Sequence, residues 1–247
     1  MSKNLSLRFS EWLSSPAGQL IAEEEIQMLA CILKENKQLE NVLIVGETSY
    51  HELIRYLPEG ACTLVGENVT QNDLPHVVKA RYTALPFLLN SMDLIILPHT
   101  LDFSLKPHKI LQEVNHCLKP EGVLVIVGFN PWGFFGLRRF FSLRQLAPWC
   151  GNFRPALKVL DWLSVLSFKR VSCHYGVFHF PIFTHSLQFL RHAGKTFCHL
   201  FPFSSGVYVI VSKKRVLGMT PYRKRWKRTK NTVENGVPNP AVREISQ

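Results

Sequence analysis

Hydrophobic positions along the chain alternate between helical spacing and short continuous runs. Leu20, Ile21, Met28, Leu29 and Ile32 recur at helical spacing after Ser14-Ser15-Pro16, a capping hydroxyl followed by proline. This pattern predicts a helix over about 16–36. The next run, 41–46, is short, apolar and rich in β-branched residues, and it ends in glycine. Such a run is typical of a strand buried on both faces of a parallel sheet.

The same alternation continues through the first half of the chain. Further strands are predicted at 62–66, 77–82, 92–97 and 123–128, and helices at 51–57 and from Pro107 to a turn at 119–122. Strands and helices that alternate at this length favour an α/β fold with a doubly wound, mostly parallel sheet. Ligands of such sheets bind at the carboxyl ends of the strands. The ends to consider are 46–47, Glu67, 98–99 and 128–130.

The second half adds two strands, which makes seven in all. A helix is predicted at 156–168, a strand at 170–177, a helix at 183–198 and a strand at 206–212. We expect an N-terminal helical segment over 1–36, one α/β domain over 37–219 and an unfolded tail over 220–247. The domain carries an insertion, 132–168, whose first part is aromatic and basic.

Composition narrows the class of protein. Hydrophobic residues make up 46% and charged residues 19%, which supports a sizeable core and excludes a wholly disordered chain. The sequence has neither a run of roughly 18 apolar residues nor a signal-peptide pattern, so we expect a cytoplasmic protein without a transmembrane segment. Its six cysteines are widely separated and lack metal-ligand spacing, which predicts free thiols and no metal site.

The formal net charge of +11 is concentrated near the C-terminus. Nine basic and no acidic residues lie within 213–230, so the rest of the chain carries only about +2. Tyr222 and Trp226 stand among these basic residues. Stacking aromatics in a cationic segment suit single-stranded nucleic acid, and anionic membranes attract the same charge. The alternative is a solvated tail without a partner.

The order of features from Leu85 to Pro131 points to a known family. Leu85-Pro86-Phe87 precedes a strand that begins Met92-Asp93, and a helix then leads through Lys119-Pro120-Glu121-Gly122 into the strand 123–128. This order resembles class I S-adenosylmethionine-dependent methyltransferases of the type 11 group, and 128–139 resembles a bacterial branch of it. The resemblance implies a seven-stranded Rossmann-like sheet with helices on both faces, S-adenosylmethionine as cofactor and methyl transfer as the activity.

The resemblance also implies the cofactor-binding positions. They are Gly46, Glu47, Glu67, Leu85, Pro98 and His99. Glu67 follows Gly46 by 21 residues, a spacing that suits a carboxylate accepting hydrogen bonds from ribose hydroxyls. A solvated turn residue is the alternative interpretation of Glu67.

Two positions depart from the family pattern. The family has E/D-x-G-x-G-x-G after the first strand, whereas Gly46 is the single glycine here, so side chains at 47–50 would crowd or reshape the loop. The family often has an acidic residue before L-P-F to contact adenine, and the span 80–84 contains none. Tyr82 or the backbone of Ala84 would then have to take that role.

Methyl transfer needs alignment of acceptor and methyl within about 3–3.5 Å, and often a base for the acceptor's proton. His99 is the candidate base, since its unperturbed pKa of about 6.5 suits proton transfer near neutrality. Asn130 is a candidate hydrogen-bonding partner of the acceptor. The alternatives are structural: a histidine bonded to the turn 100–102, and an asparagine that forms an Asn-Pro turn.

The aromatic and arginine-rich stretch 132–149 supports three interpretations. It suits a lid over an apolar or aromatic acceptor, a segment in the membrane interface, or a segment packed on the core. Two functions follow for the whole chain. The first is a methyltransferase with an unidentified acceptor; the second is a non-catalytic module of the same fold whose tail binds nucleic acid or membrane.

Overall fold

The computed structural model describes residues 2–34, 39–57, 61–67, 76–133, 136, 149–176 and 205–215. The chain divides into two compact units, Met1–Val216 and Leu217–Gln247, and every described residue lies in the first. The predicted helix at 183–198, the tail 220–247 and most of the stretch 132–149 fall outside the described residues.

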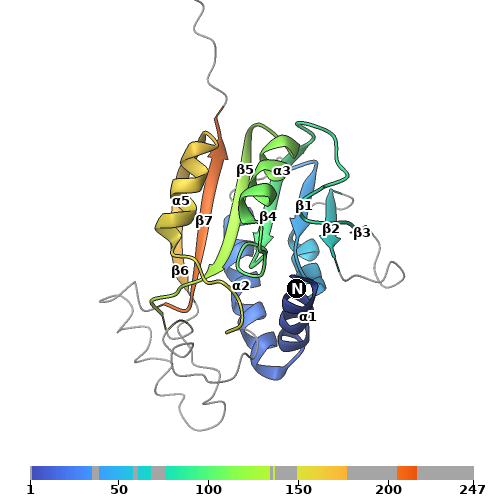
Figure 1. The fold of residues 1–247 in the computed structure, drawn as a ribbon. Coiled ribbons are helices and arrows are strands. Elements are labelled where there is room, and N and C mark those ends of the chain that lie inside the picture. Colours follow the sequence, from blue (N-terminus) through green and yellow to red (C-terminus); the bar gives the residue numbers. More distant parts are fainter. Residues whose placement is uncertain are drawn as a thin grey trace, which may run out of the picture. The chain divides into compact units, whose positions relative to one another are not determined.

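Seven strands form one sheet in the order β3-β2-β1-β4-β5-β7-β6 (Figure 1). Their bounds are β1 Val42–Val45, β2 Cys62–Gly66, β3 Val77–Lys79, β4 Met92–Pro98, β5 Leu118–Phe129, β6 Phe168–Gly176 and β7 Val207–Lys214. The first five strands run parallel, and β7 is antiparallel to both of its neighbours. The predicted fold, a doubly wound and mostly parallel sheet of seven strands, is confirmed.

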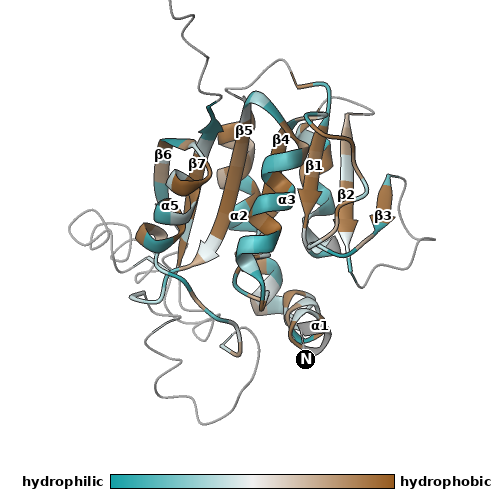
Figure 2. Cartoon of the chain, turned by 45° about the horizontal axis from the view of Figure 1, so that its top comes forward, coloured by the Kyte–Doolittle hydropathy of each residue, from teal (hydrophilic) through white to brown (hydrophobic). Residues whose placement is uncertain are grey.

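Helices cover both faces of this sheet. They are α1 Ser2–Leu13, α2 Pro16–Lys34, the 3-10 helix η1 Thr48–Tyr56, α3 Pro107–Cys117 and α5 Ala156–Val165. Successive side chains of β1 point to opposite faces: Val42 and Ile44 pack with α1, α2 and η1, and Leu43 and Val45 pack with α3 and α5. The central strands are hydrophobic along their length (Figure 2), as strands covered on both sides must be.

Helix α1 lies within the helical segment expected over 1–36, but the pattern predicted only the helix from residue 16 and not a separate helix before it. Its inward residues Leu5, Phe9 and Leu13 follow helical spacing, but the helix is only 12 residues long and its polar residues dilute the pattern. A tight turn joins it to α2, where the Ser15 hydroxyl accepts the Gly18 N–H at 3.2 Å, as predicted for the capping residue. A Cβ at Gly18 would lie 2.2 Å from the Trp12 carbonyl oxygen, so this turn requires glycine.

Several predicted boundaries shift for identifiable reasons. The turn predicted at 119–122 lies within β5: Met92 pairs with Leu118 and Leu94 with Val123, so the intervening residues bulge from the strand, with Glu121 at φ 62°. The strand predicted at 77–82 ends at Lys79. Lys213 and Lys214, counted with the basic C-terminal segment, belong to β7: Lys213 pairs with Glu121 at 3.0 Å, and Lys214 donates to the Leu118 carbonyl at 2.7 Å.

Within the described part of the chain, the five cysteines present are free thiols. The same residues contain no group of three or more histidine, cysteine or acidic side chains placed to hold a metal ion. None of the helices in these described residues has both the length and the apolar character that crossing a membrane requires.

Candidate functional site

The carboxyl ends of β1 and β4 meet where the strand order reverses, and their contact forms the floor of the site. Gly46 follows β1, and a Cβ at this position would stand 2.8 Å from Cγ of Pro98 at the end of β4. Glycine is therefore required by close approach rather than by backbone conformation. The Thr100 hydroxyl donates to the Val45 carbonyl and ties the loop after β4 to β1.

The loop after Gly46 takes a form that the missing glycines impose. The backbone turns into the 3-10 helix η1 directly after Glu47. Tyr50 points away from the loop into the core, fully buried, and its hydroxyl donates to Glu25 Oε2 of α2 at 2.5 Å. The bulky side chain at position 50 thus reshapes the loop without filling the site.

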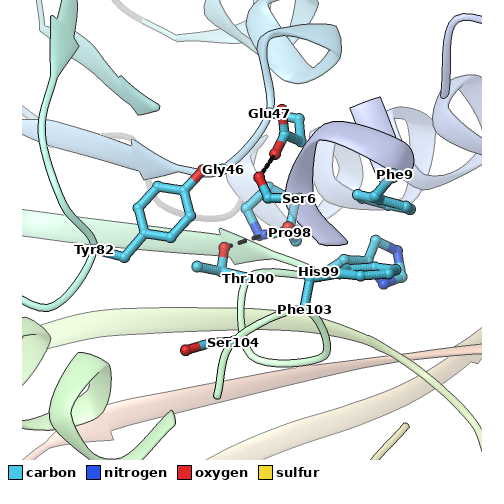
Figure 3. A pocket seen from close by; sticks show the side chains of 10 residues that line it. All are labelled: Ser6, Phe9, Gly46, Glu47, Tyr82, Pro98, His99, Thr100, Phe103 and Ser104. Atoms are coloured by element: carbon cyan, nitrogen blue, oxygen red, sulfur yellow. Dashed lines mark hydrogen bonds between the residues drawn. The ribbon is translucent and has the colours of Figure 1, made fainter. Parts of the chain in front are cut away.

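Glu47 and Tyr82 form the polar wall of the site (Figure 3). Glu47 is only 7% exposed, and the Ser6 hydroxyl of α1 donates to its carboxylate. Burial raises the pKa of Glu47, and the charge of Glu67 adds to this, while the hydroxyls of Ser6 and Ser10 act in the opposite direction. Burial likewise raises the pKa of the Tyr82 phenol.

Glu67 stands at the end of β2 and reaches the site through Tyr82. Its Oε1 accepts the Tyr82 backbone N–H at 3.2 Å, which links β2 to the loop after β3. Leu85 lies farther away: its side chain is in the core on the α3 face, and its N–H donates to Glu113 Oε2 at 3.3 Å. The structure therefore brings together Gly46, Glu47 and Pro98. Glu67 is connected to this group through its hydrogen bond with the Tyr82 backbone.

His99 is held between two carboxylates. Its Nε2 lies 2.9 Å from Glu25 Oε1 and its Nδ1 lies 3.3 Å from Asp102 Oδ2, while the ring stacks on Phe129 at 3.9 Å between centroids. Burial by itself lowers the pKa of His99, but the two carboxylates outweigh burial and raise it to about 9. The imidazole is therefore protonated near neutral pH, with both nitrogens donating.

This geometry bears on the candidate base. A protonated ring with two donating nitrogens has no lone pair to accept a proton, so a base role requires one carboxylate contact to open. The backbone of His99 has φ 52°, and Asp102 Oδ2 also accepts the Phe129 N–H at 2.9 Å. These contacts match the structural interpretation of His99, and its catalytic role stays a prediction.

Asn130 joins the end of β5 to the residues before β7. Its Nδ2 donates to the Ser205 carbonyl at 3.0 Å, and its Oδ1 accepts the Trp132 N–H at 3.1 Å. Both ends of the amide are engaged with backbone, as in the Asn-Pro turn interpretation. Its contact with an acceptor stays a prediction.

Three residues of the site come from α1 and α2, which sequence reasoning did not connect with it. Ser6 contacts Glu47, Glu25 contacts His99, and the Phe9 ring stacks on Phe103 with 4.1 Å between centroids. The sequence did contain one indication that Glu25 is buried, because this residue lies in the apolar stripe of α2 between Ala22 and Ile26. A carboxylate on a buried face needs a partner, and here that partner lies 74 residues away.

The cavity that these residues line is small and partly open to solvent. Its volume is about 30 Å³, which corresponds to about one water molecule. The walls combine the Glu47 carboxylate and the Tyr82 phenol with apolar surface from Pro98, Phe103 and Phe9. Acceptors for hydroxyl or amino groups thus lie beside an apolar wall, and Ser6 and Phe9 of α1 line the same space.

Comparison with known sequences agrees with the fold. A family model described as a methyltransferase domain matches residues 57–126, which run from the end of η1 into β5. The chain is 36% identical over 154 residues to the uncharacterized protein YafS of Escherichia coli (strain K12). That match covers 62% of this chain and 61% of YafS, so the chain spans about three fifths of the length of this curated relative.

Solved structures with the same fold include two described as S-adenosylmethionine-dependent methyltransferases. One from Thermotoga maritima, described as a possible histamine N-methyltransferase, superposes with a TM-score of 0.61 at 13% identity, covering 86% of this chain and all of that one. Another from Archaeoglobus fulgidus gives a TM-score of 0.54 at 17% identity, covering 76% and 94%. The resemblance predicted from the sequence is confirmed for the fold: a methyltransferase-domain model matches residues 57–126, and the chain has the fold of this enzyme class.

Proposed function

We propose that this chain, which carries a methyltransferase domain, binds S-adenosylmethionine at the junction of β1 and β4 and transfers its methyl group to an acceptor. The observation that carries the proposal is the place of the site. Gly46, Glu47 and Pro98 converge at the carboxyl edge where the strand order reverses between β1 and β4. Open α/β sheets bind their ligands at such switch points.

Each residue of the site has a role in this proposal. Glu67 and Glu47 accept hydrogen bonds from hydroxyl and amino groups of the cofactor, which a neutral side chain would do less well. Gly46 lets the backbone approach the ligand, and Pro98 and Phe103 offer apolar walls. The bound cofactor supplies an electrophilic methyl group. The chain's own contribution is to align the reactants and to exclude water.

The acceptor is proposed to be apolar or aromatic. Trp132 directly follows the edge of β5 and is 77% exposed, although tryptophan is usually well covered. An exposed indole at the ligand-binding edge of the sheet suits stacking with a flat, apolar acceptor. The free thiols of the described cysteines suit the reducing environment expected for a protein acting in the cytoplasm of a bacterium.

A second candidate function is a binding module without catalysis. It is favoured by the small cavity and by the single glycine of the β1 loop. The basic residues from Arg215 to Lys230 would then bind nucleic acid or an anionic membrane. Binding that weakens steeply with salt and disappears on removal of 217–247 would support this role for the tail.

Calorimetric titration of S-adenosylmethionine and S-adenosylhomocysteine into the purified chain tests the first function. Micromolar affinity, about −8 kcal/mol, is expected. Glu67→Ala should weaken it at least tenfold, since a hydrogen bond to a charged group contributes about 1.5–3 kcal/mol. Glu40→Ala, which removes an exposed carboxylate, is the matched control. Absence of binding at millimolar ligand would contradict the enzyme and leave the binding module.

A further inference from the structure

We propose that α1 is an internal plug of the cofactor pocket, which occupies the place of the ligand and has to move away before the ligand binds. The inference rests on the proposed function, because it takes the junction of β1 and β4 as the cofactor site. It adds a closed state that the chain maintains through its own N-terminal helix.

The polar half of the plug is Ser6. Its hydroxyl donates to the Glu47 carboxylate and lies beside the Tyr82 phenol (Figure 3). A hydroxyl or amino group of a ligand would use the same acceptor. Ser6 and the ligand therefore compete for Glu47, and the buried carboxylate exchanges one partner for another without being left unpaired.

The apolar half of the plug is Phe9. The side chain is 2% exposed, stacks on Phe103 and meets the edge of His99 at 5.5 Å between centroids. This ring covers the apolar wall of the site as a flat ligand ring would. Phe9 and Ser6 lie three residues apart on one helix face, so a single movement of α1 removes both.

Size makes the movement necessary. The space left beside α1 is about 30 Å³, whereas pockets for small molecules and cofactors measure about 300–1,000 Å³. The opposite side of the cavity is fixed by the close approach of Gly46 to Pro98 and by the hydrogen bond of Thr100 to the Val45 carbonyl, so we expect the side of α1 to give way. Displacement of α1 opens the pocket to a larger ligand.

The chain around α1 permits such a movement. The helix is joined to α2 by the two-residue turn Ser14-Ser15, and its outer residues Leu7, Arg8 and Glu11 are exposed. Helix α2 is anchored separately, through the contacts of Glu25 with His99 and Tyr50. Helix α1 can therefore leave by bending at the turn while the floor of the site and α2 stay in place.

Stopped-flow and calorimetric binding of S-adenosylhomocysteine to plug variants of the full chain test the proposal. Phe9→Ala and Ser6→Ala should each tighten binding at least fivefold and accelerate association, because the closed state is weakened. Leu7→Ala, on the exposed side of the same helix, should stay within twofold of the unchanged chain. Weaker binding by both Phe9→Ala and Ser6→Ala would overturn the plug and make α1 a wall of the bound site.

Hydrogen exchange supplies a second measurement that does not depend on the variants. Addition of S-adenosylhomocysteine should speed amide exchange in α1 and leave that of α2 between Ile21 and Leu33 unchanged. Slower exchange in α1 on ligand addition would overturn the proposal. If the unchanged chain binds ligand and the variants bind it equally, only the plug fails. If neither the unchanged chain nor any variant binds at millimolar ligand, the proposed function fails together with the plug.

Discussion

The ends of β4 and β5 differ from the ends of β1 and β2, although all four strands reach the same edge of the sheet. After β4, His99 and Asp102 are bonded to Glu25 and to the Phe129 backbone, all of them deeply buried. After β1 and β2, the carboxylates of Glu47 and Glu67 meet a hydroxyl of α1 and one backbone N–H. The first set is bound within the core, and the second relies on partners that a ligand can replace.

The comparison separates stability from binding in a group of polar residues that look alike in sequence. A histidine whose two ring nitrogens both bond to carboxylates contributes to the fold and has no nitrogen left to bind a ligand. A buried carboxylate whose partner is a serine hydroxyl, such as Glu47, is costly to keep charged, and this cost favours a cationic or doubly donating partner. Substitutions at the two places should therefore affect different measurements.

The largest effect is expected for Glu25→Leu. The substitution removes one carboxylate from the buried His99 and leaves its charge partly uncompensated, along with the Tyr50 hydroxyl. Breaking a buried pair in this way costs about 3–5 kcal/mol of unfolding free energy, measured by chemical denaturation. Glu23→Leu, an exposed position on the same helix, should change stability by less than about 0.5 kcal/mol. Equal losses for the two variants would show that helix α2, rather than the ion pair, is responsible.

The next effect concerns pH. The pKa of His99 is about 9 in the folded chain, against an ordinary value of 6.5. Its stabilising contribution is complete below pH 6.5 and is lost as pH rises toward 9, which amounts to about 3 kcal/mol. Denaturation midpoints measured between pH 6 and 9.5 should fall accordingly. The slope should flatten in His99→Gln, and a slope retained by that variant would assign it to another group.

The smallest stability effect is expected at Glu47. Glu47→Gln keeps the shape of the side chain and an acceptor for Ser6. It removes a buried carboxylate, whose pKa is raised by burial. Unfolding free energy should stay the same or increase by about 1 kcal/mol, while affinity for S-adenosylhomocysteine should fall about tenfold. A loss of stability comparable with that of Glu25→Leu would mean that Glu47, like Glu25, stabilises the fold rather than serving a ligand.

Much of the fold could be predicted from the sequence alone. Val42–Val45, Leu94–Pro98 and the residues 123–129 of β5 are apolar runs, and their interior position in a parallel sheet follows from that composition. The L-P-F and K-P-E-G elements identified the fold class, and Gly46 and Pro98, both expected at the carboxyl edge of the sheet, line one cavity there. Local patterns suffice for such features because each depends on neighbouring residues.

The tertiary structure alone decided which polar residues meet. Glu25 and His99 are separated by 74 residues, and Ser6 and Glu47 by 41. No local spacing predicts these pairs, because they form only when α1 and α2 pack over the sheet edge. The sequence thus determined the sheet, through hydrophobic burial. Packing determined that His99 lies between two carboxylates and that Ser6 and Phe9 of α1 line the cavity, since the surroundings of a buried group depend on residues distant in the chain.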